Sequence, residues 1–237
     1  MRLKLITVDL DDTLWPCAPV IRGAEHALHA WLADRAPRLA EAHDTDSLRA
    51  HRMALMRDRP EIAHDLTAVR LHAMRALMEQ FGYAPTLADQ AVALFQQHRN
   101  RVQPYADVAP ALTRLGVHCR LVAVTNGNAE VHATPLSAVF HHALTAAEAG
   151  AAKPDPALFQ LAMRRVGVGP AETLHVGDDP VRDVEAARRV GIGAVWVNRD
   201  GRPWPEELPP PLLQVTELGA MVDWLVQQGW CGEDHAV

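Results

Sequence analysis

Carboxylate side chains follow two short apolar runs of the sequence. Asp9 and Asp11 come directly after the run 5–8, and Asp178 follows the run 174–176. Carboxylates that lie close together raise one another's pKa unless a cation sits among them. Hard oxygen ligands in this number fit Mg²⁺, which commonly binds a few carboxylates together with waters and a substrate phosphate. If these segments meet in the fold, they predict a magnesium site.

The spacing of Asp9 and Asp11 suits phosphoryl chemistry. A carboxylate can attack phosphorus and form an aspartyl-phosphate, which splits hydrolysis into two easier steps. At the fraying end of a strand, residues two apart lie near one side, so Asp11 can act as acid and base beside Asp9. Because phosphoryl transfer depends mostly on positioning and charge, Mg²⁺, Lys153, the Thr125 hydroxyl and nearby backbone N–H groups would hold the non-bridging oxygens.

The elements that must position these residues alternate along most of the chain. Apolar runs without polar alternation are typical of parallel strands covered on both faces, and they span residues 5–8, 121–124, 174–176 and 194–197. A last strand is expected near 213–215 and a last helix near 218–228. The pattern predicts a doubly wound, Rossmann-like α/β fold with a mostly parallel sheet. Ligands in such sheets bind beyond the carboxyl ends of the strands, where Asp9, Thr125 and Asp178 would meet.

Two helices of this core have readable ends. One is expected to begin at Pro156, after an Asp155 cap, and to run to about Val166. The other is expected over 181–190, and Gly191 would close it.

The segment 15–103 contains no strand-like run. Its apolar residues recur at helical spacing, in three main stripes and a weaker one: Ile21, Ala24, Leu28 and Leu32; Leu66, Val69, Ala73 and Leu77; Leu87, Ala91, Leu94 and His98; Leu48 and Leu55. We expect an all-helical domain over 15–103, inserted into a catalytic α/β core of residues 1–14 and 104–237. Trp15 is expected to line the pocket at this junction. Arg70, with Glu61, His64 and Asp65, is compatible with substrate contact, but the simpler interpretation is a helix start with a solvated face.

Four short motifs occur in a set order along the chain. They are D-x-D-x-T at 9–13, Thr-Asn-Gly at 125–127, the lysine of KPDP at 153, and Gly-Asp at 177–178 with the later Asp183. Together they resemble the haloacid dehalogenase superfamily of phosphatases, and the helical insert lies where that family carries its cap domain. The resemblance implies an enzyme, a phosphoric monoester hydrolase.

The resemblance implies a role for each matching carboxylate. Asp9 would be the nucleophile and a metal ligand. Asp11 would protonate the leaving oxygen and then activate water, while its backbone carbonyl binds the metal. Asp178 would be the third protein ligand to Mg²⁺. Asp183 would support the metal ligands without binding the ion itself, and Asp179 would bind a metal-bound water.

Phosphate binding falls to the remaining motif residues. Thr125 and the backbone of Asn126 would bind the phosphate, and Lys153 would neutralise the phosphoryl group and orient Asp9. The segments 59–70, 123–129 and 174–187 are also similar to a bacterial branch that hydrolyses FMN and 5-amino-6-(5-phosphoribitylamino)uracil, which places the substrate in riboflavin biosynthesis.

Three other functions are compatible with parts of the pattern. A 2-haloacid dehalogenase uses the same nucleophile and a similar cap, but it needs no metal and no proton for its leaving group, so Asp11 would be a superfluous charge. A phosphomutase is not separated from a hydrolase by the sequence. A phospho-accepting signalling or binding module would share an Asp, a Thr and a Lys around Mg²⁺ but lack the second carboxylate and the large insert.

Composition limits the partners. The formal net charge is −6, which argues against general binding to nucleic acid or to a membrane surface. The cysteines, Cys17, Cys119 and Cys231, are widely separated and give no disulfide framework. The N-terminus is no signal peptide and no apolar run approaches the roughly 20 residues of a membrane span. We therefore expect a cytoplasmic monomer or homodimer whose partner is a small phosphorylated metabolite.

Overall fold

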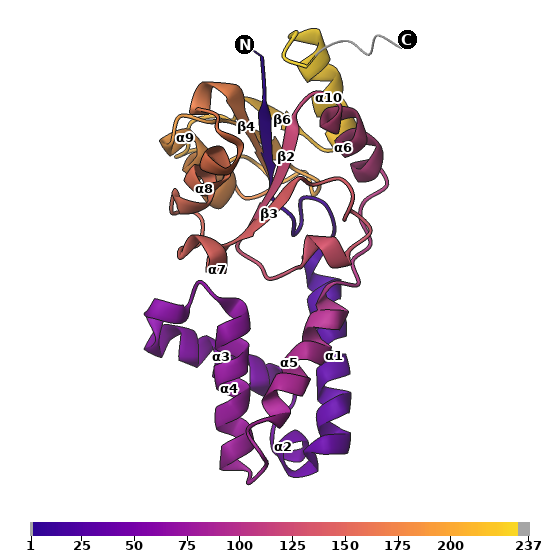
Figure 1. The fold of residues 1–237 in the computed structure, drawn as a ribbon, viewed down its shortest axis with the longest axis vertical. Coiled ribbons are helices and arrows are strands. Elements are labelled where there is room, and N and C mark those ends of the chain that lie inside the picture. The colour runs from indigo at the N-terminus through magenta and orange to yellow at the C-terminus, as the bar shows by residue number, and fades with distance from the viewer. Residues whose placement is uncertain (1, 232–237) are drawn as a thin grey trace. The chain divides into compact units, whose positions relative to one another are not determined.

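The computed structural model describes residues 2–231 and divides the chain into two compact units. The first unit comprises residues 1–16 and 103–237, and the second comprises residues 17–102 (Figure 1). Trp15, Pro16 and Gln103, which the sequence places with the insert, cluster instead with the first unit. Trp15 belongs with the first unit because its indole N–H donates to Asp11 Oδ1 at 2.9 Å.

A six-stranded parallel sheet forms the centre of the first unit. The strand order is β3-β2-β1-β4-β5-β6, and each neighbouring pair is parallel. The strands are β1 (Leu5–Val8), β2 (Arg120–Thr125), β3 (His142–Thr145), β4 (Thr173–Gly177), β5 (Gly193–Val197) and β6 (Leu213–Val215). The expected doubly wound α/β fold is confirmed.

Helices cover both faces of this sheet, with α8 and α9 on one side and α6 and α10 on the other (Figure 1). Their bounds are α6 (Val108–Gly116), α7 (Ala146–Ala149), α8 (Ala157–Val166), α9 (Ala186–Arg189) and α10 (Leu218–Gln227). The α8 face packs Leu158, Phe159 and Ala162 against Val122 and Trp196 of the sheet in one apolar cluster. Burial on both faces explains why the strands have continuous apolar runs.

The predicted strands are all present, and the structure adds β3. Its sequence, HALT, carries exposed residues at positions 142 and 143, because β3 lies at the edge of the sheet. An edge strand needs no continuous apolar run, so the pattern gave no signal. The expected helix from Pro156 is also present, and Asp155 Oδ1 accepts from Ala157 N at 2.9 Å.

The helix expected over 181–190 has an irregular first part. A π-helical turn, η4 (Pro180–Glu185), precedes α9, and Gly191 follows with a φ of 79°. Short 3₁₀ turns elsewhere in this unit are η2 (Val131–Ala133) and η3 (Pro170–Glu172).

The second unit is helical throughout. Its elements are α1 (Cys17–Arg35), α2 (Pro37–Ala42), α3 (Thr45–Asp58), η1 (Pro60–Ile62), α4 (Leu66–Gln80) and α5 (Leu87–Arg99). Leu28, Leu32, Met74, Leu77 and Phe95 belong to its core. The predicted stripes occur on α1, α3, α4 and α5, whereas the short α2 was not predicted.

Two details of the helical unit differ from the expectation. On α5 the buried residues include Phe95 and Arg99 rather than Leu94 and His98. Arg70 does not lie on a solvated face, since it is only 8% exposed. The apolar pattern did not predict the burial of Arg99 or Arg70, because it assigns arginine to solvent by default.

The structure also bears on the membrane and cysteine expectations. Within residues 2–231, no helix combines the length and the apolar character that crossing a bilayer requires. Cys119 and Cys231, although distant in sequence, lie with their sulfur atoms 3.9 Å apart and are both free thiols.

Candidate active site

The site lies at the carboxyl ends of the three central strands. β1 lies between β2 and β4 in the sheet. Asp9 follows β1, Thr125 ends β2 and Asp178 follows β4. The backbone N–H of Asp9 continues the parallel ladder by donating to Val176 O at 2.9 Å. Strand order therefore places these three motif residues at one edge.

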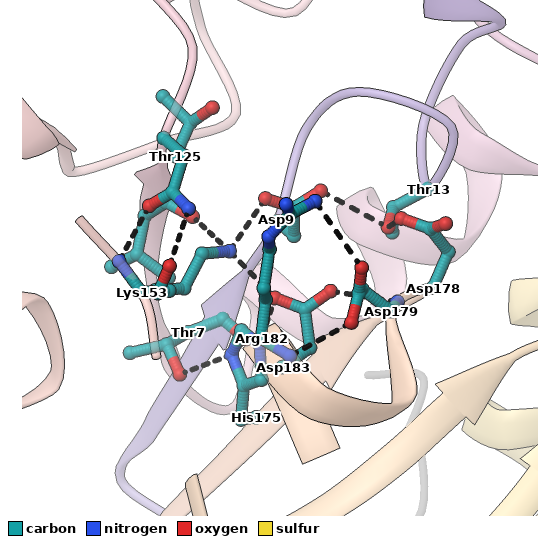
Figure 2. A network of polar contacts seen from close by, with 12 residues as sticks. Thr7, Asp9, Thr13, Thr125, Lys153, His175, Asp178, Asp179, Arg182 and Asp183 are labelled. Carbon is teal, nitrogen blue, oxygen red and sulfur yellow. Dashed lines mark hydrogen bonds and ion pairs between the residues drawn. The ribbon is translucent and has the colours of Figure 1, made fainter. Parts of the chain in front are cut away.

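Lys153 is the central cation of the site. Its Nζ donates to Asp9 Oδ1 at 2.6 Å, to Asp183 Oδ1 at 2.6 Å and to the carbonyl oxygen of Val124 at 3.0 Å (Figure 2). All three donor protons of the ammonium are used, and Lys153 is only 3% exposed. Burial alone would lower the pKa of Lys153, but the carboxylates of Asp183 and Asp9 outweigh it and raise that pKa. The lysine is therefore a fixed positive charge.

Asp9, Asp178 and Asp183 form a compact acidic cluster. Each offers a carboxylate oxygen, and these oxygens lie within 4.8 Å of one another. The hydroxyl of Thr13 is 3.3 Å from both Asp9 Oδ2 and Asp178 Oδ1, so it bridges two members of the cluster. Lys153 reaches Asp9 and Asp183 but has no bond to Asp178 among the contacts found in residues 2–231.

The pKa values of this cluster show an excess of negative charge. Burial raises the pKa of Asp9 well above its ordinary range, and the nearby Asp183 and Asp178 add to the effect against Lys153. Burial, together with Asp183 and Asp12, raises the pKa of Asp178 to about 7. A cation between Asp9 and Asp178 would relieve this repulsion. The donor set is all oxygen, which fits a hard divalent ion.

Asp183 is the best-satisfied member of the cluster. It accepts from Lys153 Nζ, and its Oδ2 accepts from the backbone N–H of Asp179 at 3.0 Å. His175 Nε2 is 3.2 Å from Asp183 Oδ1. Against the effect of burial, Lys153 and His175 lower the pKa of Asp183. Asp183 is therefore ionised and holds Lys153 in place.

Gly177 makes room for Asp183. A Cβ atom at position 177 would lie 2.3 Å from Asp183 Cγ, a distance that real side chains do not reach. The Gly-Asp motif thus has a steric reason. The glycine lets the later carboxylate pack directly against the end of β4.

Asp178 is held from the other side. Trp196 Nε1 donates to its main-chain oxygen at 2.7 Å, and Arg202 Nη2 lies 3.3 Å from its Oδ2. The side-chain amide of Asn198 in turn bonds the backbone of Arg202, with Nδ2 donating to the oxygen at 2.8 Å and Oδ1 accepting from the N–H at 2.9 Å.

The Thr125 motif has two structural tasks. Thr125 is 2% exposed, and its hydroxyl oxygen accepts from Gly127 N at 2.9 Å. Asn126 bonds the main chain of Lys153 through its side-chain amide. Because the sequence assigned phosphate binding to the Asn126 backbone, this side-chain contact is an addition to the expected site.

Asp11 is partly buried, and its Oδ1 accepts from the indole N–H of Trp15. Trp15 is fully buried, so the expectation that it lines a pocket is wrong. Its large side chain instead fixes the conformation of Asp11. The Asp179 carboxylate caps η4 by accepting from Val181 N and Arg182 N at 2.9 and 2.8 Å. The expected role of Asp179 on a metal-bound water stays a prediction.

Two contributors were missed in the sequence. Thr13 is part of D-x-D-x-T, so the motif itself carried the signal for its bridging hydroxyl. His175 is fully buried and bonds Asp183 on one side and Thr7 Oγ1, at 2.9 Å, on the other (Figure 2). The signal for His175 was a polar residue in the middle of a run that otherwise predicts a buried strand.

Comparison with known proteins agrees with this geometry. Residues 3–191 match the profile of the haloacid dehalogenase-like hydrolases. The chain is 32% identical to the 5-amino-6-(5-phospho-D-ribitylamino)uracil phosphatase YigB of Escherichia coli, over 93% of this chain and 95% of that protein. It is also 32% identical to a phosphoserine phosphatase of Thermus thermophilus, over 89% of this chain and 94% of that one.

A solved structure is also similar to nearly the whole chain. The crystal structure of a 2-haloacid dehalogenase from Pseudomonas syringae superposes with a TM-score of 0.89 at 37% identity and covers 96% of this chain and 100% of that one. The profile match extends over most of the chain, and the two curated relatives are similar along nearly their whole length. The chain belongs to the haloacid dehalogenase-like hydrolase family, and its relatives include phosphatases.

Proposed function

We propose that this protein is a magnesium-dependent phosphomonoester hydrolase that works through an aspartyl-phosphate on Asp9. The observation that carries the proposal is the pairing of Asp9 with Lys153 at 2.6 Å beside a second carboxylate, Asp178, whose ion pair within residues 2–231 is with the more exposed Arg202. This arrangement supplies a nucleophile, a fixed positive charge for a phosphoryl group and oxygen ligands for a cation.

Asp9, the backbone carbonyl of Asp11, and Asp178 would hold Mg²⁺. When bound, the ion supplies positive charge that stabilises the non-bridging oxygens of the transferred group. The raised pKa of Asp178, about 7, supports an ion there, because the same carboxylates repel one another without it.

The chain's own residues perform the proposed chemistry in two steps. An oxygen of Asp9 attacks phosphorus, and Asp11 gives its proton to the leaving alkoxide. Asp11 then accepts a proton from the water that cleaves the aspartyl-phosphate. Lys153 and the Thr125 hydroxyl neutralise and orient the phosphoryl oxygens, and Asp183 keeps Lys153 aligned through its 2.6 Å bond.

The substrate is proposed to be a small phosphorylated metabolite. The activity of the E. coli relative supports 5-amino-6-(5-phospho-D-ribitylamino)uracil as the substrate. FMN is the other candidate from the riboflavin pathway. The helical unit 17–102 would act as the cap, and a net charge of −6 argues against nucleic acid or an anionic membrane as partner. A cytoplasmic location and a monomer or homodimer fit this function.

A 2-haloacid dehalogenase is the second candidate, favoured by the Pseudomonas structure. Its reaction releases halide without a metal and without protonation of the leaving group. Asp11, held in place by Trp15, would then have no task. The acidic cluster would likewise disfavour halide displacement, since Asp183 and Asp178 raise the pKa of the nucleophile Asp9.

One experiment separates these candidates. The protein is incubated with a panel of phosphate esters and with 2-chloropropionate, with added Mg²⁺ or with EDTA, and inorganic phosphate and chloride are both measured. Phosphate release that EDTA abolishes supports the proposal. Chloride release that resists EDTA identifies a dehalogenase. Transfer of phosphate to a second metabolite without net release identifies a mutase, and a persistent phospho-Asp9 identifies a phospho-accepting module.

A further inference from the structure

The helical unit contains a buried arginine that the proposed reaction does not use. Arg70 lies on α4 and is only 8% exposed. A guanidinium keeps its proton in proteins, so burial cannot neutralise it as it could a lysine or histidine. The positive charge of Arg70 therefore needs a partner within the structure.

The donors of Arg70 are incompletely used. Its Nε and Nη1 atoms are buried and have no hydrogen-bond partner among the described residues. The ring of Phe95 packs against the guanidinium, with Cζ 3.2 Å from the ring centroid. A cation–π contact occupies one face of the guanidinium plane, whereas the N–H groups point outward within that plane. The aromatic contact therefore orients Arg70 and leaves in-plane donors for an acceptor.

The charges around Arg70 favour an anion. After burial, Arg52 is the largest influence that lowers the pKa of Arg70, and Arg99 adds to it. Glu25 opposes them, but its carboxylate already forms an ion pair with Arg52. Arg99 is itself only 1% exposed. The one carboxylate that favours the charge of Arg70 is thus already paired with a neighbouring arginine.

We propose that Arg70, stacked on Phe95 and flanked by Arg52 and Arg99, binds an oxyanion of the carboxylate or phosphate class inside the helical unit. Such groups accept two parallel N–H bonds from one guanidinium, which is the geometry that the fork of Arg70 offers. The oxyanion can have two sources. It is either a non-reacting acidic group of the substrate, in which case the inference rests on the proposed phosphatase function, or a free inorganic anion.

The first test measures anion binding without catalysis. Sulfate is the probe, EDTA is present, and the melting temperature of the full chain is followed as sulfate increases. Arg70→Met removes the donors but keeps most of the apolar stem. Arg75→Met is the matched control, because Arg75 lies on the same helix, is exposed and pairs with Asp89 at 2.8 Å.

Sulfate should raise the melting temperature of the wild type and of Arg75→Met by similar amounts, and that of Arg70→Met by clearly less. Arg70→Lys, which keeps the charge but loses the fork, should fall between them. Any sulfate bound in the core is common to all four proteins, so only the difference counts. Equal sulfate shifts in all four would overturn the proposal.

The second test identifies the source of the anion. The specificity constant kcat/KM is compared for p-nitrophenyl phosphate and for a phosphate ester that carries a carboxylate, such as phosphoserine. If the substrate supplies the anion, Arg70→Met lowers kcat/KM for the carboxylated ester by at least about tenfold and spares the other. If a free ion binds, the ratio is unchanged while the sulfate shift is still lost. If no ester is hydrolysed, the proposed function fails, and the sulfate measurement still decides the anion site.

Discussion

The side-chain amide of Asn126 binds the main chain of Lys153 in both directions. Nδ2 donates to Lys153 O at 2.8 Å, and Oδ1 accepts from Lys153 N at 2.7 Å. Residue 126 follows β2 and residue 153 lies in a loop, so this pair ties the loop to the sheet edge. The position of the Lys153 ammonium beside Asp9 depends on that tie.

Replacing Asn126 should therefore impair catalysis through Lys153. Asn126→Ala should lower kcat by about 10- to 100-fold, because sub-ångström displacement of a positioning group has effects of that size. Thr134→Ala is the matched control, since the Thr134 hydroxyl also bonds the main chain in both directions, donating to Val131 O at 2.7 Å and accepting from Leu136 N at 3.3 Å within its own segment. Both variants should lose about 1–3 kcal/mol of unfolding free energy. Equal kcat values for the two variants would show that the Asn126 bond is only structural.

Asp9→Asn should abolish turnover and leave the fold intact. The amide cannot attack phosphorus, and burial of the charged form already opposes folding, as the raised pKa of Asp9 shows. Unfolding by denaturant should therefore give a midpoint at or above that of the wild type. Asp155→Asn, an exposed change at the α8 cap, should keep full activity. Normal rates in Asp9→Asn would refute the nucleophile assignment.

Asp11→Asn should separate the two chemical steps. The Trp15 indole can still donate to the amide oxygen, so the loop should keep its conformation. With a good leaving group such as p-nitrophenolate the first step continues, while water is no longer activated for the second. Intact-mass spectrometry should show the protein carrying one added phosphoryl group. Asp9→Asn,Asp11→Asn is the control and should show no added mass.

Removal of the metal should make stability depend on pH. The folded pKa of Asp178, about 7, is above its ordinary value of 3.8, so the folded protein binds a proton that the unfolded chain has lost between these values. Unfolding free energy contributed by this group therefore falls as pH rises from about 4 to about 7. The raised pKa of Asp9 also makes the unfolding free energy fall as pH rises. The lowered pKa of Asp183 affects the unfolding free energy only below pH 4.

Denaturant unfolding in EDTA should show this slope in the wild type and a smaller one in Asp178→Asn. Mg²⁺ should stabilise the wild type more at pH 7.5 than at pH 5, because protons compete for the same oxygens. A stabilisation by Mg²⁺ that is equal at both pH values would contradict a site built on Asp178.

Gly177→Ala should damage the site through Asp183. The new Cβ would lie 2.3 Å from Asp183 Cγ and force the carboxylate away from Lys153. We expect a loss of about 1–3 kcal/mol in unfolding free energy and a large fall in kcat. Gly219→Ala is the control, because nothing lies within 4 Å of a Cβ there and alanine favours the helix. Comparable stability in the two variants would contradict the close packing.

Much of the fold could be predicted because the core strands are buried on both faces. Burial forces continuous apolar runs, and these identified β1, β2, β4 and β5, while helical spacing identified the main helices of the second unit. The edge strand β3 and the short α2 escaped because neither needs such a pattern. Arg70 was assigned to solvent because an apolar pattern does not reveal a buried charge.

The sequence by itself determined which residues carry the proposed chemistry, because an attacking carboxylate, a second one two residues later and an oxygen-ligand set require particular residue types at particular spacings. Tertiary structure alone decided how they are held. The contacts of Lys153 with Asp9 and of Thr13 with Asp178 join residues 144 and 165 positions apart. Such contacts depend on the order of strands in the sheet, which puts β1 between β2 and β4, and no local pattern encodes that order.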